Sequence, residues 1–167
     1  MQISMYEALV PVANRMLANL SNILDKGAAF AEAKKIEQTV LTNARLAPDM
    51  FPLTRQVQIA CDMVKGGVAR LGGVEVPKHE DNETTFADLK ARVAKVQAFI
   101  NSVPAASFAG SEDRAITLNM RSGDMHFTGL DYLRYFVLPN FYFHMTAAYA
   151  ILRHNGVDLG KSDFIGQ

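Results

Sequence analysis

Two polar side chains near the end of the chain could do chemistry from one side of a single helix. The stretch from Pro139 to Gly156 is apolar at most positions, and Asn140 and His144 stand four residues apart within it. Residues at that spacing project from the same side of a helix. A helix that is apolar nearly all round is expected to be buried, and a buried imidazole beside a buried amide needs a reason. That reason is either a metal site or the remains of one.

A third polar residue, Gln56, interrupts the apolar side of an earlier predicted helix that runs from Pro52 to Leu71. In a four-helix bundle, polar groups from two helices can meet at the axis, where bundles build their metal and ligand sites. Imidazole is a good ligand for Zn, Ni or Fe, but amide oxygens bind these ions weakly, and a catalytic zinc usually takes three His, carboxylate or Cys ligands. Three interpretations therefore stay open for Gln56, Asn140 and His144: a hydrogen-bond network, a small-molecule site without metal, and a metal site that includes His144.

A fourth candidate, Arg45, lies in the loop that enters the Gln56 helix, four residues before Asp49. The two charges could pair and fix the loop, although an isolated ion pair contributes little stability. If the loop instead covers the Gln56 end of the bundle, Arg45 could receive an anionic ligand. Both interpretations predict that this loop packs near the start of the helix.

The single cysteine, Cys61, lies beside the apolar face of the same helix. It is expected to be an inert buried thiol, and it excludes a disulfide framework within the chain. A lone cysteine fits a reducing compartment, and the first residues lack the basic and apolar regions of a signal peptide, so we expect a cytoplasmic protein.

Charge and hydropathy exclude two classes of partner. The formal net charge is zero and no Lys/Arg run forms a stripe, so a nucleic-acid partner is not expected. The segment from Tyr135 to Leu152 has 18 residues without a formal charge, which by length could be a membrane span. Pro139 and the polar side chains within it argue against a span, because no second segment would shelter those groups from lipid. We expect a core helix of a soluble bundle.

The elements that must position these residues are four helices in one domain, residues 1–167. Ser4 and Glu7 form a capping box that begins the first helix, which Pro11 should kink. Gly27 is predicted to break this helix before a second short amphipathic piece, residues 28–36. Residues 38–52 are predicted as a connection with at most one short turn of helix, which leads into the Gln56 helix.

The second half of the chain predicts two further helices and a hairpin. The acidic residues 80–83 are interpreted as a solvated cap for a helix from Thr84 or Thr85 to about residue 101. Residues 116–120 and 125–128 alternate like strands around residues 121–124, which predicts a β-hairpin with a Ser-Gly turn. Thr128 and Asp131 cap the last helix, which Pro139 kinks and Gly156 ends. The predicted fold class is all-α: a four-helix bundle with kinked first and last helices and a small hairpin before the last helix.

The chain resembles the DinB/YfiT-like four-helix-bundle superfamily, and more closely a bacterial branch of it known as a domain of unknown function. The likeness spans almost the whole chain, and its most specific passages are residues 43–53 (NARLAPDMFPL), 70–73 (RLGG), 139–144 (PNFYFH) and 151–156 (ILRHNG). The superfamily is known for a three-histidine site, with one His on the second helix and a His-x-x-x-His pair on the last, which binds Zn, Ni or a similar ion. Several members are thiol transferases or isomerases.

The resemblance places His144 at the second histidine of that pair, Asn140 at the first and Gln56 at the second-helix position, so one ligand of three remains. Three functions are expected to compete. The first is a non-catalytic or small-ligand-binding bundle with a degenerate metal site. The second is a thiol transferase or isomerase that depends on a divalent metal, Zn or Ni. The third is a dimeric interaction protein without a ligand site. Because an all-round apolar helix leaves one side for a partner chain, we also expect a homodimer.

Overall fold

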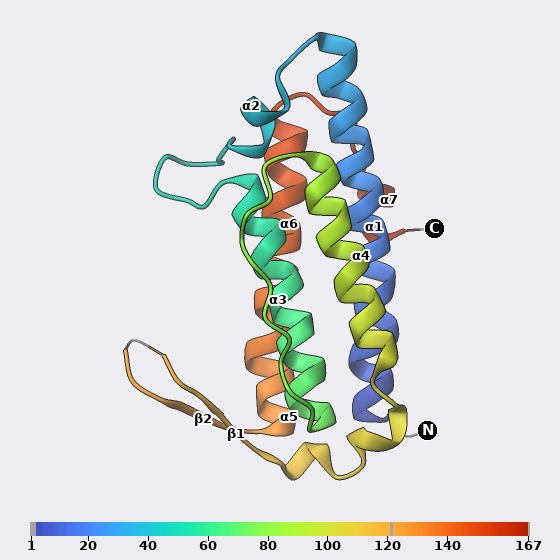
Figure 1. The fold of residues 1–167 in the computed structure, drawn as a ribbon, viewed down its shortest axis with the longest axis vertical. Coiled ribbons are helices and arrows are strands. Elements are labelled where there is room, and N and C mark those ends of the chain that lie inside the picture. The colour runs from blue at the N-terminus through green and yellow to red at the C-terminus, as the bar shows by residue number, and fades with distance from the viewer. Residues whose placement is uncertain (1–2, 121, 167) are drawn as a thin grey trace.

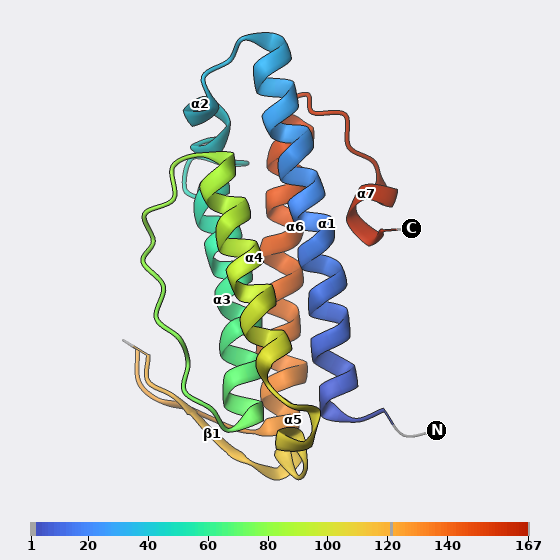
Figure 2. The same ribbon diagram turned by 45° about the vertical axis from the view of Figure 1, so that its right-hand side comes forward.

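Four long helices pack side by side in the computed structural model, which describes residues 3–120 and 122–166. They are α1 (Met5–Lys34), α3 (Leu53–Gly72), α4 (Phe86–Ser102) and α6 (Leu138–His154). α1 and α6 run in one direction, while α3 and α4 run in the other (Figure 1). α3 packs against both α4 and α6, and α1 packs against α4, as the turned view in Figure 2 also shows. The predicted four-helix bundle is confirmed.

Short elements connect and close the bundle. In chain order they are α2 (Gln38–Thr42), the 3₁₀ segments η1 (Ala105–Phe108) and η2 (Ser111–Asp113), the strands β1 (Ala115–Leu118) and β2 (Met125–Thr128), α5 (Gly129–Asp131), the π-helical segment η3 (Tyr132–Val137), and α7 (Lys161–Ile165). The strands pair antiparallel, with Ala115 opposite Thr128, so the predicted hairpin is confirmed. Arg121, in the predicted turn, lies outside the described residues. α7 was not predicted.

The first helix corrects one prediction. The capping box of Ser4 and Glu7 is present, but α1 continues without a break through Gly27 to Lys34. Gly27 is buried, and a Cβ built on it would lie 2.9 Å from the Phe86 ring and 3.2 Å from a Leu152 methyl carbon. The glycine therefore allows α4 and α6 to approach α1 closely, and packing outweighs its cost of about 1 kcal/mol in helix propensity.

The last helical stretch begins with the predicted cap, in which the Thr128 side chain accepts from the Asp131 backbone N–H. A π-helical segment then precedes α6, and Pro139 lies in the first turn of α6. Proline has no backbone N–H to donate to the carbonyl four residues earlier, and a π-turn, which bonds five residues apart, suits such a sequence.

One side of this stretch is not covered by the rest of the chain. Tyr135 is 70% exposed, Phe143 58% and Tyr142 37%, whereas Phe141, Met145 and Ala148 lie in the core. The residues are apolar nearly all round, but the chain itself covers only the side that faces α3 and α1. The outward side therefore presents aromatic rings to solvent.

A long crossover explains why α3 and α4 run in the same direction. Residues 74–84, which we call the strap, return along the outside of α3 from its end to the start of α4 (Figure 1). The acidic residues of the strap were predicted to be a solvated cap, and this prediction is incomplete. Arg92, only 3% exposed, forms ion pairs with Asp81 and Glu83 at 3.0 Å and donates to the carbonyl of Glu80.

The same buried guanidinium joins the strap to α3 through Asp62, at 2.9 Å. The α3 side chains Arg55 and Gln58 add hydrogen bonds to Asp81 and Glu83. Because a buried charge is stable only when it is paired and hydrogen-bonded, Arg92 ties three segments together. This network positions α3, which carries Gln56.

Cys61 is a free, fully buried thiol in the core. Burial raises its pKa to about 12, and this effect exceeds the opposing influence of the Arg92 charge. A thiol that is buried and protonated in this way is unreactive, as expected from the sequence. Among the described residues, no helix is both long and apolar enough to cross a membrane.

Candidate functional site

α3 and α6 bring Gln56 and His144 into direct contact across the bundle. The two side chains are 1% and 8% exposed, and His144 Nδ1 lies 2.7 Å from Gln56 Oε1. Gln56 is in the first turns of α3, and the α6 residues around His144 pack against the same part of that helix. The prediction that these two residues meet inside the bundle agrees with this geometry.

The second hydrogen bond of Gln56 defines the tautomer of His144. Gln56 Nε2 donates to the backbone carbonyl of Phe51 at 3.1 Å, and a carbonyl can only accept, so the amide nitrogen must face Phe51. The amide oxygen then faces His144 and requires a proton on Nδ1. In the neutral ring Nε2 therefore keeps its lone pair, and no hydrogen bond from the described residues reaches that atom.

The surroundings keep this imidazole neutral. Burial lowers the pKa of His144 below its usual value of 6.5, and the positive charge of Arg55 lowers it further. The ring of Phe143 stands edge-on to the imidazole, with centroids 5.2 Å apart. The oriented amide, burial and the neighbouring cation together leave a hydrogen-bond acceptor at Nε2.

Asn140 does not join this pair. Its side chain is partly buried and donates to the backbone carbonyl of Phe136 at 2.7 Å, one turn earlier in the same helical stretch. The carbonyl is close to the position where Pro139 interrupts regular helix bonding, so the amide supports the backbone. The spacing of four residues placed Asn140 and His144 on one side of the helix, but it did not determine where the amide points.

Arg45 also forms a different contact from the one expected. Its side chain is exposed and donates to the carbonyl of Met50, and no ion pair with Asp49 occurs in the part of the chain that the structure describes. The guanidinium closes its own loop, which is anchored at the start of α3 by a hydrogen bond from Leu53 N–H to Ala44 carbonyl. No hydrogen bond joins Arg45 to Gln56 or His144. A role in binding an anion stays a prediction.

The donor set does not fit the three-histidine site that the resemblance implies. His144 is one nitrogen ligand, the Gln56 amide is already bonded on both ends, and the Asn140 amide is turned to the backbone. Within residues 3–120 and 122–166, no group of three or more His, Cys, Asp or Glu side chains could hold a metal ion. Zn and Ni sites require more charged or imidazole ligands than this arrangement offers.

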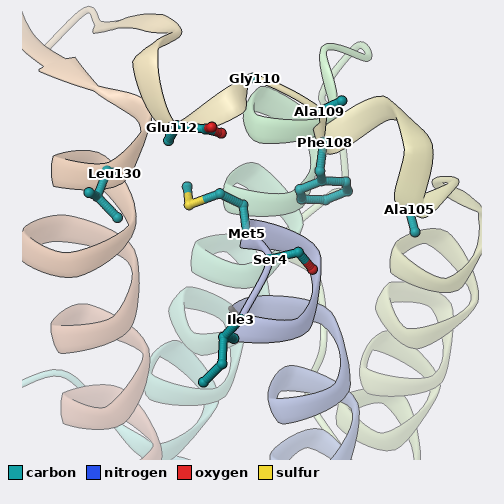
Figure 3. A pocket seen from close by; sticks show the side chains of 9 residues that line it. All are labelled: Ile3, Ser4, Met5, Ala105, Phe108, Ala109, Gly110, Glu112 and Leu130. Atoms are coloured by element: carbon teal, nitrogen blue, oxygen red, sulfur yellow. The ribbon is translucent and has the colours of Figure 1, made fainter. Parts of the chain in front are cut away.

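The larger hollows of the surface lie away from Gln56 and His144. One of about 680 Å³ lies at the end of the bundle between the start of α1, the segment 105–112 and Leu130 (Figure 3). Its only charged lining side chain is Glu112, and Ser4 is occupied with capping α1. This hollow therefore offers few groups that would orient a ligand. Another hollow, of about 390 Å³, lies between α3 and the end of β1 that leads into the hairpin turn.

Sequence reasoning missed three contributors to the site. Phe51 orients the Gln56 amide, Arg55 lowers the pKa of His144, and Phe143 forms one wall. Arg55 adjoins Gln56 in the sequence and Phe143 adjoins His144, so proximity along the chain was a usable signal for both. Phe51 acts through its backbone carbonyl, and every residue type has one, so the sequence contains no signal for this contact.

Comparison with known proteins gives the family. The family model described as "Domain of unknown function (DUF1993)" matches residues 5–165. The fold is similar to that of a crystal structure of a DinB family member protein from Shewanella denitrificans, with 47% sequence identity and a TM-score of 0.92 over 98% of this chain and 92% of that one. Among curated proteins, none matches this chain. The chain belongs to the DUF1993 family, a DinB-like family of unknown function.

Proposed function

We propose that this protein is a non-catalytic bundle that binds a small molecule at His144. The observation that carries the proposal is the hydrogen bond between His144 Nδ1 and Gln56 Oε1, which leaves Nε2 as an acceptor without a partner among the described residues. A ligand would donate an N–H or O–H group to Nε2 and place a flat apolar part against Phe143, which is largely exposed. Arg45 stays a candidate for an anionic group of the same ligand, since its loop joins the start of α3.

We propose a non-catalytic role because of the group that is hydrogen-bonded to the His144 imidazole. A histidine that acts as a general base is usually oriented by a carboxylate and stands beside a nucleophile. Here the orienting group is a neutral amide, which stabilises an imidazolium less than a carboxylate does and does not exchange protons at neutral pH. The chain's cysteine, Cys61, is buried with a pKa of about 12, so it is not a thiolate nucleophile.

A screen of small molecules by thermal shift tests the proposal with two matched variants on α6. His144→Gln keeps an amide that can bond Gln56 but removes the imidazole, and His154→Gln changes an exposed histidine on the same helix. Compounds with a hydrogen-bond donor on an aromatic ring should raise the Tm of wild type and His154→Gln and leave His144→Gln unchanged. Compounds that raise the Tm of all three proteins equally, or no active compound at all, would reject the site.

A second candidate, a metal-dependent thiol transferase or isomerase, would use His144 as one Zn or Ni ligand. It needs a cosubstrate, water or an unassigned side chain to complete the metal's ligands, because Gln56 and Asn140 are engaged elsewhere. We rank the metal-dependent enzyme second because the chain itself offers only one good metal ligand at this site.

A third candidate is a homodimeric interaction protein. The exposed aromatic residues of η3 and α6 favour a dimer whichever of the three candidate functions the protein has. Tyr135, Tyr142 and Phe143 present rings on the outward side of one helical stretch. Exposed aromatic groups of this kind are typical of protein interfaces. We also propose a cytoplasmic location, which rests on the free thiol of Cys61.

A further inference from the structure

The hollow of about 390 Å³ beside α3 contains charged groups that the His144 site does not use. Its walls come from the second half of α3, the strap, the end of β1 with the residues that follow it, and η3. It lies well along α3 from the first turns of that helix, because its α3 lining residues are Asp62 to Arg70. Neither Gln56 nor His144 lines it.

Lys65 is the first unusual group in this hollow, because its ammonium is charged and the residue is only 6% exposed. Among the described residues its one hydrogen-bond partner is Asp62 Oδ1, at 2.7 Å. That oxygen is shared with the buried Arg92 guanidinium, at 2.9 Å. An ammonium has three donors, so two remain for another group. A buried cation with one shared carboxylate favours the approach of an anion.

Arg70 and Tyr132 form the second donor pair. Arg70 Nη1 donates to the Tyr132 hydroxyl at 3.0 Å, and Tyr132 is 2% exposed. The hydroxyl accepts in that bond and so keeps its own proton to donate. Burial raises the pKa of Tyr132 above its usual value of 10, and Arg70 opposes this effect, so the phenol is neutral at pH 7. Arginine keeps further N–H groups in the plane of its guanidinium.

Gly66 makes this arrangement possible. A Cβ built on Gly66 would lie 2.5 Å from Arg70 Nη1 and 3.8 Å from the Tyr132 hydroxyl. The guanidinium therefore lies over the bare helix backbone at Gly66, in space that any other residue would fill. The group that packs against Gly66 is therefore a charged side chain that lines the hollow.

The rest of the lining is largely apolar and comes from several elements. It includes Met63 of α3, Val76 of the strap, Leu118 and Met120 at the hairpin, and Phe136 of η3. Small-molecule sites commonly combine such a surface with a few convergent polar groups that orient the ligand.

We propose that this hollow binds a small organic acid, with its carboxylate held by Lys65, Arg70 and Tyr132 and its apolar part against Phe136. Asp62 does not oppose a second carboxylate strongly, because it is paired with both Lys65 and Arg92. Bidentate pairing of a carboxylate with a guanidinium, with an ammonium beside it, is the strongest form of this recognition. The site is independent of the function proposed for His144.

Titrations of ¹⁵N-labelled protein with phenylacetate, hexanoate and indole-3-acetate test the proposal. At least one acid should shift the amide signals around Lys65, Tyr132 and Leu118 in a saturable way, without saturable shifts at His144. Phenylacetamide and inorganic phosphate separate the two parts of the recognition, since one lacks the charge and the other lacks the apolar part. Both should bind at least tenfold more weakly than the best acid, a difference of about 1.4 kcal/mol.

Two variants test the assigned residues, and one serves as control. Lys65→Met keeps the length of the side chain and leaves Asp62 paired with Arg92, so the protein should fold and bind the acid about tenfold or more weakly. Gly66→Ala should displace the Arg70 guanidinium and weaken binding, with the free energy of unfolding kept because alanine favours a helix. Lys95→Met, an exposed change on α4, should bind as wild type does.

The proposal is overturned by any of four results. The first is that none of the three acids gives saturable shifts up to about 10 mM, where even weak fragments bind. The second is that phenylacetamide or phosphate binds as tightly as the best acid, and the third is that both Lys65→Met and Gly66→Ala bind the acid with unchanged affinity. The fourth is that the shifts are confined to the surroundings of His144.

Discussion

His144 is defined by its neighbours more than by its residue type. The Phe51 carbonyl orients the Gln56 amide, the amide fixes the proton on His144 Nδ1, and burial with the Arg55 charge keeps the ring neutral. Each step follows from which atoms donate and which accept. Sequence reasoning found Gln56 and His144 because they are polar residues on apolar helix faces. It could not place the Asn140 amide, because its partner is a backbone carbonyl.

The state of His144 leads to a pH prediction. Its pKa in the folded protein lies below 6.5, the unfolded value, so the unfolded chain binds a proton first as the pH falls. Stability from this group is therefore present above pH 6.5 and declines as the pH falls from 6.5 toward the folded pKa. Gln56→Glu places a carboxylate beside the ring, which should raise the pKa of His144 and reduce this loss.

NMR titration of the histidine rings and urea unfolding at pH 7 and pH 5 measure both effects. Gln97→Glu on α4 is the control, because Gln97 donates to the Asn14 carbonyl and does not contact His144. A His144 pKa that is the same in wild type and Gln56→Glu would contradict the hydrogen-bonded pair.

At the scale of elements, local sequence signals predicted the helices well. Ser4 with Glu7 and Thr128 with Asp131 cap the helices that they were predicted to begin, and of the two threonines proposed for α4, Thr85 is the cap. Predictions failed where a distant residue decides the structure. Gly27 lies within a continuous helix, and the side chains of Phe86 and Leu152 pack where its Cβ would be. The acidic strap is paired because the Arg92 side chain of α4 contacts it. No local pattern contains those partners.

The strap provides the prediction at this scale. Arg92→Met should lower the free energy of unfolding by about 3 kcal/mol or more, because Glu83 and Asp62 would lose their buried partner. Lys90→Met, also on α4, removes a more exposed ion pair with Asp25 and should cost less than about 1 kcal/mol. Urea unfolding of the two variants gives the comparison. Equal losses would show that the buried network does not hold the strap.

For the whole molecule, the exposed aromatic rings lie on the outward side of η3 and α6. The last helix was expected to be buried but to leave one side for a partner chain, and Tyr135 and Phe143 on the outward side are mostly exposed. Hydrophobic pattern predicts that a face will be covered, but it does not say whether the same chain covers it.

The homodimer prediction follows from those rings. Light scattering at micromolar concentration should give twice the chain mass of 18.4 kDa. The double variant Tyr135→Glu/Phe143→Glu should be a monomer with unchanged helix content, because both side chains are already exposed. Val40→Glu, at an exposed apolar residue of α2, should leave the mass unchanged. A monomeric wild type would contradict the prediction.

We propose that Gln56 and Asn140 are amides at two positions where a three-histidine site would have ligands. The most direct test is elemental analysis of protein made without a histidine tag, incubated with zinc and then desalted. Wild type should retain far less than one zinc per chain, and Gln56→His/Asn140→His, which restores three imidazoles, should retain about one. A wild type that holds about one zinc per chain and loses it in His144→Ala would contradict the account.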